Sequence, residues 1–358
     1  MEVASAMERC IGLCLEKGID FAVCLMPGET VPHIFIPSLP DQGKTRGTVF
    51  EIGPWLKPYA ERITIDGETD LKTAFPFLEM IPTTPDSDNA PNEGIPVRST
   101  TRESYLADVS KVIDSCRHRG GKTVFSRVIC GETQPNSWPK VFSALCESFP
   151  ETFRFIFHSR LTGGWIGATP ETLLDVDTTN GCFRTMAFAG TRAIAAHHAH
   201  WDEKNIRENR YVSDYLTEKI NSLGMEANVG EPTTVAYGSN IEHLCRHITG
   251  SLPSGTEFQP LLDAINPTPA LCGSPLADAV GDLSLHERHE RGCYGGFVAL
   301  HDNRRFNSFV TLRCCAFNQS RFAIYAGGGI TPDSIPENEW DETEAKSLFF
   351  RRYLQNNS

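Results

Sequence analysis

The feature that most constrains the fold of this chain is a series of short apolar segments between residues 122 and 326, most of them joined by short polar turns. The segments have strand length: Lys122–Ile129, Phe153–His158, Trp165–Ala168, Thr172–Val176, Phe183–Phe188, Cys293–Leu300, Phe309–Phe317 and Phe322–Ala326. Short connections favour antiparallel pairing, because a parallel crossover needs a dozen or more residues, usually a helix. The pattern therefore predicts an α+β fold with large antiparallel sheets flanked by helices.

The first 98 residues carry a similar pattern. A helix is expected over Ala4–Lys17, followed by short strands at Phe21–Leu25, His33–Ile36, Thr48–Ile52 and Arg62–Ile65. Residues 82–96 are rich in proline, aspartate, asparagine and threonine, which is typical of a loop or subdomain boundary. We therefore predict an amino-terminal segment, residues 1–98, that contributes strands to the fold, and a second region, residues 99–358.

Three longer helices are expected in the second region. They span Arg102–Cys116, Trp201–Leu223 and Glu337–Tyr353. Glycines follow the first two, as glycine often does at the carboxyl end of a helix. The third has serine and glutamate at a capping-box spacing and a proline in its first turn.

The composition excludes several classes of protein. Hydrophobic residues make up 40% and charged residues 22% of the chain, which is typical of a globular protein. With a net charge of −12 and no cluster of lysine and arginine, nucleic acid and membrane surfaces are not expected partners. The sequence has neither a membrane-spanning apolar stretch nor a secretion signal, so we expect a cytoplasmic protein. Its twelve cysteines form no C-x-x-C pair, and free thiols are expected.

The last predicted helix carries acidic and basic side chains on one face. Glu339, Glu342 and Lys346 are spaced at i, i+3 and i+7. Such a set is more often a solvated helix surface than a binding site. Here, however, the helix follows a strand that ends in Gly327–Gly329, where backbone can approach a ligand closely. Carboxylates beside exposed N–H groups suit a metal-bridged anion, and a few hard oxygen ligands favour Mg²⁺.

Other candidate site residues are weaker evidence of a binding site when each is considered alone. Asn205 and Glu208 are also three residues apart, on the helix predicted at Trp201–Leu223. Glu171 follows a glycine-rich strand and a proline. Lys122 lies in an apolar strand, where burial would favour the neutral amine that acts as a general base, although an edge lysine that reaches solvent is the commoner case.

Taken together, the motifs of residues 122–346 resemble those of the chorismate-utilising enzymes. These motifs are Lys122–Arg127, Gly167–Glu171, Ala189–Arg192, Asn240–Leu244 with Gly250, Pro267–Ala270, Glu290–Gly295, Leu312–Arg313, Ala326–Ile330, and Glu339–Thr343 with Lys346. The family includes isochorismate, salicylate, anthranilate and aminodeoxychorismate synthases, and all nine motifs occur in family order. The amino-terminal third has no comparable motif, so the resemblance implies a variable segment at 1–98 and a chorismate-binding catalytic region at 99–358.

Within this family the resemblance is to the isochorismate synthases. It rests on Pro267–Ala270 followed by Cys272–Pro275. The amine-adding members and the salicylate synthases have a different sequence in this segment. A lysine that forms a covalent adduct in aminodeoxychorismate synthases would fall near Ala189, which leaves water as the nucleophile. The resemblance thus implies a Mg²⁺-dependent isomerase that converts chorismate to isochorismate for menaquinone or siderophore biosynthesis, without a glutaminase subunit.

The resemblance also implies a role for each site residue. Lys122 matches the general base that activates water, and Glu171 matches the general acid that protonates the departing hydroxyl. The metal positions are Glu208 and Glu342 as direct Mg²⁺ ligands and Glu339 through a metal-bound water. The positions that line the chorismate pocket are Gly190, Thr191, His243, Tyr294, Arg313, Gly327, Gly329 and Lys346. Asn205 replaces a glutamate of many relatives and supplies no charge, which predicts weaker Mg²⁺ binding.

Two alternatives stay open at this point. A salicylate synthase would go on to eliminate pyruvate from isochorismate in the same pocket. A non-catalytic chorismate-binding protein or subunit would have no need of both proton-transfer groups, Lys122 and Glu171, so their presence speaks against it.

Overall fold

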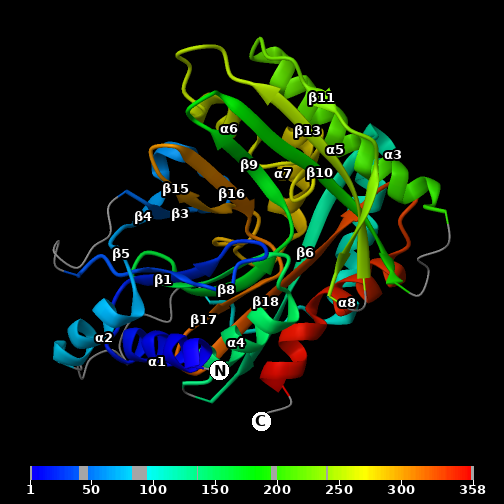
Figure 1. Cartoon of the computed structure of the whole chain (residues 1–358). Coiled ribbons are helices and arrows are strands. Elements are labelled where there is room, and N and C mark those ends of the chain that lie inside the picture. Colours follow the sequence, from blue (N-terminus) through cyan, green and yellow to red (C-terminus); the bar gives the residue numbers. More distant parts are fainter. Residues whose placement is uncertain are drawn as a thin grey trace.

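The computed structural model describes residues 2–39, 47–82, 95–134, 136–194, 200–238 and 241–355. Its main features are two large antiparallel sheets with helices packed around them (Figure 1). The predicted α+β class is therefore confirmed. Within these residues, no helix combines the length and the apolar character needed to cross a membrane. The loop expected at residues 82–96 falls almost entirely outside the described ranges.

The first sheet is built around the long strands β6 and β18. Its order is β14 (Gly273–Ser274), β6 (Lys122–Glu132), β18 (Arg321–Ile330), β17 (Cys314–Phe317), β8 (Gly163–Thr169), β7 (Phe153–Ser159), β1 (Phe21–Leu25), β2 (His33–Phe35) and β5 (Glu68–Thr69). Strands β6 and β18 pair antiparallel, with Gly327 opposite Ser126 and Gly329 opposite Val124. This register places the glycines next to the start of β6, two residues from Lys122.

The second sheet is built around β10 and β13. Its order is β11 (Asn228–Val229), β13 (Ile241–Ser251), β10 (Cys182–Ala193), β9 (Thr172–Asp177), β16 (Arg305–Val310), β15 (Phe297–His301), β3 (Val49–Gly53) and β4 (Ile63–Ile65), and β12 (Thr233–Tyr237) also pairs with β13. The register between β10 and β13 shifts between Phe188 and Thr191. Gly190 lies in this irregularity with φ +88°, a conformation that glycine adopts without steric cost.

The two sheets share one hydrophobic core. Phe155 and Phe157 of β7 belong to the same buried cluster as Phe297 of β15 and Phe306 of β16. Side chains of β1 alternate between this cluster, which holds Ala22 and Cys24, and a second cluster, which holds Phe21, Val23 and Leu25. Because successive side chains of a strand point to opposite faces, the first sheet is buried on both sides.

Helices cover the outer faces and edges of the sheets. Their bounds are α1 (Glu2–Glu16), α2 (Leu71–Met80), α3 (Arg102–Arg119), α4 (Trp138–Ser148), α5 (Glu203–Ser222), α6 (Gln259–Ile265), α7 (Leu276–His286) and α8 (Pro336–Gln355), with a 3₁₀ turn at Tyr59–Glu61. Helices α1 and α4 contact each other beside the first sheet, α5 packs against β10 and β13, and α8 packs against β18 (Figure 1). Helix α5 thus lies against the long strands of the second sheet, and α8 lies against the long strand β18 of the first sheet.

The structure corrects two of the predicted strands. The segment Phe309–Phe317 is not one strand, because β16 ends at Val310 in the second sheet and β17 begins at Cys314 in the first. The chain changes sheet at Arg313, whose φ of 51° lies in the left-handed region. The segment predicted from Cys293 becomes a strand only at Phe297, after a turn at Gly295 with φ +83°. Helices α2, α4, α6 and α7 and strands β5, β11, β12, β13 and β14 were not predicted.

Candidate active site

A pocket opens where β10, β13 and β18 meet α8 and α5, and it encloses about 560 Å³ including its open mouth. All eight residues predicted to bind substrate line it, namely Gly190, Thr191, His243, Tyr294, Arg313, Gly327, Gly329 and Lys346, together with Glu171 and Glu208. The structure therefore brings together residues that are up to 175 positions apart in the sequence, from Glu171 to Lys346.

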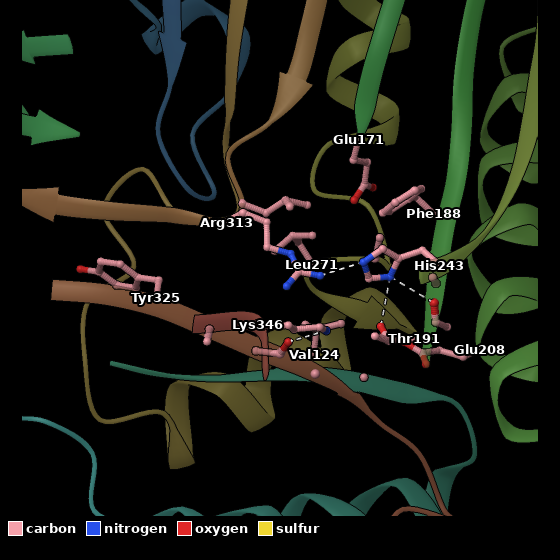
Figure 2. Close-up of a pocket in the computed structure, with 18 of the residues that line it drawn as sticks. Val124, Glu171, Phe188, Thr191, Glu208, His243, Leu271, Arg313, Tyr325 and Lys346 are labelled. Atoms are coloured by element: carbon pink, nitrogen blue, oxygen red, sulfur yellow. Dashed lines mark hydrogen bonds between the residues drawn. The ribbon is translucent and has the colours of Figure 1, made fainter. Parts of the chain in front are cut away.

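Arg313 and His243 form the central polar pair of the pocket (Figure 2). The guanidinium Nη2 of Arg313 donates to Nε2 of His243 at 2.8 Å. Burial, with the nearby positive charges, holds the pKa of His243 well below its usual value, so the ring is neutral and Nδ1 carries its hydrogen. Nδ1 lies 3.2 Å from the Gly190 carbonyl oxygen and 3.1 Å from the Thr191 hydroxyl. The imidazole thus fixes the guanidinium of Arg313.

Arg313 has a free donor inside the pocket. Its Nη1 is buried and has no hydrogen-bond partner among the described residues. The guanidinium carbon lies 4.7 Å from the centre of the Tyr237 ring, a cation–π contact that holds the side chain from one side. A buried guanidinium with an unpaired N–H is suited to bind a carboxylate.

Glu171 lies in the short turn between β8 and β9, and its side chain points into the pocket near Phe188 (Figure 2). The residue is 1% exposed, and Oε1 has no hydrogen-bond partner in the described part of the chain. Burial raises the pKa of Glu171 to about 8, against the opposing effect of Lys122, Lys346 and Arg313. The carboxyl is therefore protonated at neutral pH and can act as an acid.

Lys122 opens β6 and is fully buried, as the functional interpretation of the sequence required. Its Nζ lies 3.2 Å from Oε1 of Glu208 on α5. It is not among the residues that line the pocket, whereas Glu208 is. Lys122 is thus placed behind the Glu208 carboxylate, and Glu208 must move or exchange its partner before the amine can reach a molecule in the pocket.

The glycines of β18 make room for the acidic side chains. A Cβ on Gly329 would lie 2.1 Å from Glu208 Oε1, and a Cβ on Gly328 would lie 3.2 Å from Glu339 Oε2 and 3.3 Å from Glu342 Oε1. A Cβ contact below 3.0 Å is sterically excluded unless the neighbour moves. Gly329 is therefore required for the position of Glu208, and the three carboxylates gather around two consecutive glycines.

Each of the three carboxylates is paired with a lysine. Lys346 donates to Glu342 at 2.5 Å and to the Gly327 carbonyl oxygen at 2.9 Å. Burial raises the pKa of Glu342, but Lys346 and Lys204 outweigh this effect, and the pKa lies below its usual value. Glu339 accepts from Lys204 at 2.7 Å. The site is thus balanced in charge by lysines.

The donor set fits a divalent cation that keeps part of its coordination shell from water or substrate. Oε2 of Glu339 is buried without a partner among the described residues, and Glu342 and Glu208 lie around the same glycines. Within the described ranges, no group of three or more His, Cys, Asp or Glu side chains is placed so that it could hold a metal ion. Mg²⁺ commonly binds through one or two carboxylates and retains water or substrate oxygens, so such a partial set is sufficient.

Several residues of the site were missed from the sequence. Phe188 and Leu271 line the pocket, and the Phe188 ring packs on His243 with centroids 4.7 Å apart. Lys204 was also missed, although it lies four residues before Glu208 and therefore on the same helix face. Asn205 was noted only for its missing charge. Its Oδ1 accepts a hydrogen bond from the Thr191 amide at 3.0 Å, so it also positions the pocket wall.

Comparisons with known proteins show the family of this chain. The family model described as "Chorismate binding enzyme" matches residues 65–355. The chain belongs to this family. The matched range contains all the predicted site residues, whereas strands β1, β2 and β3 lie before it. It begins before the boundary expected near residue 98, which stays a prediction.

The relatives of this chain include more than one kind of synthase. A chloroplastic isochorismate synthase of Catharanthus roseus is 26% identical over 271 residues, 71% of this chain and 46% of the relative. Anthranilate synthase component 1 of Bacillus pumilus is 30% identical over 202 residues, 53% of this chain and 39% of the relative. The chain thus spans less than half the length of these two relatives.

A solved structure shares the fold. The structure of MenF, the menaquinone-specific isochorismate synthase of Escherichia coli, matches with a TM-score of 0.75 at 19% identity, over 97% of this chain and 91% of that chain. Nearly the whole of both chains is therefore built on the same arrangement of sheets and helices.

Proposed function

We propose that this chain is an isochorismate synthase, an isomerase that adds water at C2 of chorismate and expels the C4 hydroxyl. The observation that carries the proposal is the Glu171 carboxyl, which is buried with an unpaired oxygen in the same pocket as the unpaired donor of Arg313. Burial raises the pKa of this carboxyl to about 8. A protonated acid beside Arg313 can protonate a departing hydroxyl while the guanidinium holds a carboxylate of the same molecule. The isochorismate synthases among the relatives support this choice.

In this proposal the substrate is a dicarboxylate. Arg313, oriented by the neutral ring of His243, binds one carboxylate through Nη1. Glu171 transfers its proton to the C4 oxygen. Once Glu208 has turned to another cation, the Lys122 ammonium releases a proton to solvent, and the neutral amine then accepts a proton from the attacking water. Ala189 is small and lines the pocket, which leaves space for that water. The remaining lining residues, Gly190, Thr191, Tyr294, Gly327, Gly329 and Lys346, position the ring and its substituents.

Mg²⁺ is the proposed cofactor. Glu208 and Glu342 would hold it directly and Glu339 through a water, and when bound it supplies positive charge for a substrate carboxylate. The lysine partners of these carboxylates show that the site already attracts cations. We also propose the cytoplasm as the compartment, since all twelve cysteines are free thiols and this state is typical of a reducing environment.

The decisive experiment is a product assay with chorismate and Mg²⁺, analysed by chromatography and mass spectrometry. We expect a mixture of chorismate and isochorismate whose new hydroxyl carries the label of ¹⁸O-water, and no turnover in EDTA. Added ammonia should give no anthranilate. Stoichiometric pyruvate with salicylate would assign the chain to the salicylate synthases instead, and a chain that binds chorismate without turnover would be a binding protein. Which pathway uses the isochorismate, menaquinone or siderophore, depends on neighbouring enzymes.

A further inference from the structure

Lys204 lies in the carboxylate cluster but has no part in the proposed reaction. It precedes Asn205 on α5, and its Nζ donates to Oε1 of Glu339 on α8 at 2.7 Å. The ammonium therefore joins the two helices that carry the proposed metal ligands, Glu208 on α5 and Glu342 on α8. A cation already occupies the region between them.

The ammonium acts on all three carboxylates. The carboxylates of Glu339 and Glu342 lie close together. A Cβ added to Gly328 would have an oxygen of each carboxylate within 3.3 Å. Burial lowers the pKa of Lys204, but attraction from Glu339, Glu342 and Glu208 outweighs burial and raises it. One positive charge thus offsets the mutual repulsion of the buried carboxylates.

Of the three lysines in the cluster, Lys204 can leave most easily. The side chain of Lys122 is 0% exposed and that of Lys346 is 14% exposed, whereas that of Lys204 is 25% exposed. A lysine has a flexible stem of four methylene groups, so a partly exposed ammonium can turn into solvent while its helix stays in place. Lys122 and Lys346 would have to open the pocket to do the same.

We propose that Lys204 is a resident counter-cation that pairs with Glu339 when no divalent cation is bound and turns to solvent when Mg²⁺ enters. The ammonium and the metal compete for the same carboxylates, so Lys204 weakens Mg²⁺ binding in the absence of chorismate. The identity of the metal rests on the proposed function, whereas the competition rests on the contacts of Lys204 alone.

The test is a calorimetric titration of MgCl₂ into the full chain without chorismate. Lys204→Met keeps the length of the side chain and removes its charge, and we expect Mg²⁺ to bind at least about tenfold more tightly than to the wild type. Lys204→Arg keeps the charge and should stay close to the wild type. Lys57→Met is the matched control, because it removes one charge from an exposed ion pair with Glu61 and should leave Mg²⁺ affinity unchanged.

Thermal unfolding gives a second readout. In EDTA, Lys204→Met should melt below the wild type, because Glu339 loses its partner, and Mg²⁺ should raise its Tm by more than that of the wild type. Lys204→Gln serves in the same way if the methionine variant does not fold. A folded variant that binds Mg²⁺ no more tightly than Lys57→Met, or not at all, would overturn the inference. If Mg²⁺ binds as expected but the product assay shows no isochorismate, the proposed function fails and the competition stands.

Discussion

At the scale of single residues, the burial of Glu171 predicts that enzymatic activity depends on pH. Its pKa of about 8, raised by burial, means that the acid form is present below pH 8 and is lost as pH rises through that value. We predict that kcat/KM, which reports the groups of the free enzyme, falls with this apparent pKa on the alkaline side. Glu171→Gln keeps the shape but has no proton to give, and it should be nearly inactive at every pH. A wild-type profile that stays flat from pH 7 to 9 would contradict the assignment.

The same carboxyl should make the folded state less stable at alkaline pH. Between the ordinary glutamate pKa and about 8, folded Glu171 keeps a proton that the unfolded chain has released, so the free energy of unfolding falls as pH rises across this window. Glu171→Gln removes this dependence. We predict that the variant equals the wild type near pH 4 and is more stable at pH 9, as measured by urea unfolding. Equal stability at both pH values would show that Glu171 is not held protonated.

Lys122 provides the matching test for the base. Lys122→Ala should reduce kcat by roughly 10²–10⁴-fold, the usual contribution of one positioned proton-transfer group, with a much smaller change in KM. Substrate binding would persist because Arg313 and Lys346 are untouched. Lys111→Ala, which removes a lysine whose partner is Asp108 on α3, serves as the control. Near-normal kcat for Lys122→Ala would show that another group takes the proton from water.

At the scale of elements, strand β18 positions the acidic side chains of two helices. Gly329→Ala would place a Cβ 2.1 Å from Glu208 Oε1, so the Glu208 carboxylate would have to turn away from its position beside Lys122. We predict at least a tenfold rise in the Mg²⁺ concentration needed for half-maximal activity, with an unchanged circular dichroism spectrum. Gly281→Ala on α7, where nothing lies within 4 Å of the new Cβ, should leave the Mg²⁺ requirement unaltered. An unaffected Gly329→Ala enzyme would show that Glu208 does not act from this position.

At the scale of the whole molecule, the two sheets should unfold together because they share a core. The ring of Phe153, in the first sheet, stacks on that of Phe309, in the second, with centroids 4.3 Å apart. Phe153→Ala should lower the free energy of unfolding by about 3–5 kcal/mol. Exposed Leu161 gives a control, as Leu161→Ala should change it by less than about 0.5 kcal/mol. Separate transitions by circular dichroism and tryptophan fluorescence would contradict a single core.

The sequence by itself determined the class of fold and the types of residue in the site. Apolar segments of strand length joined by short polar turns predicted the antiparallel strands, and helical patterns with their end signals predicted the three long helices, because these features depend only on neighbouring positions. Ordered motifs predicted the residues of the site. Ten of them line one pocket, whereas Lys122, Glu339 and Glu342 are not among its lining residues. The patterns failed where a residue changes sheet, as at Arg313, since no local signal marks a left-handed arginine.

Only the tertiary structure decided how those side chains work. The pKa of Glu171 depends on burial by strands that are distant in sequence, and the free donor of Arg313 depends on His243 from another strand. The contact between Lys204 and Glu339 exists only because α5 and α8 lie together around β18, so it could not be predicted from the sequence. Charge pairing and desolvation are set by distances in space, and the spacing of residues along a chain does not contain those distances once the chain passes between two sheets.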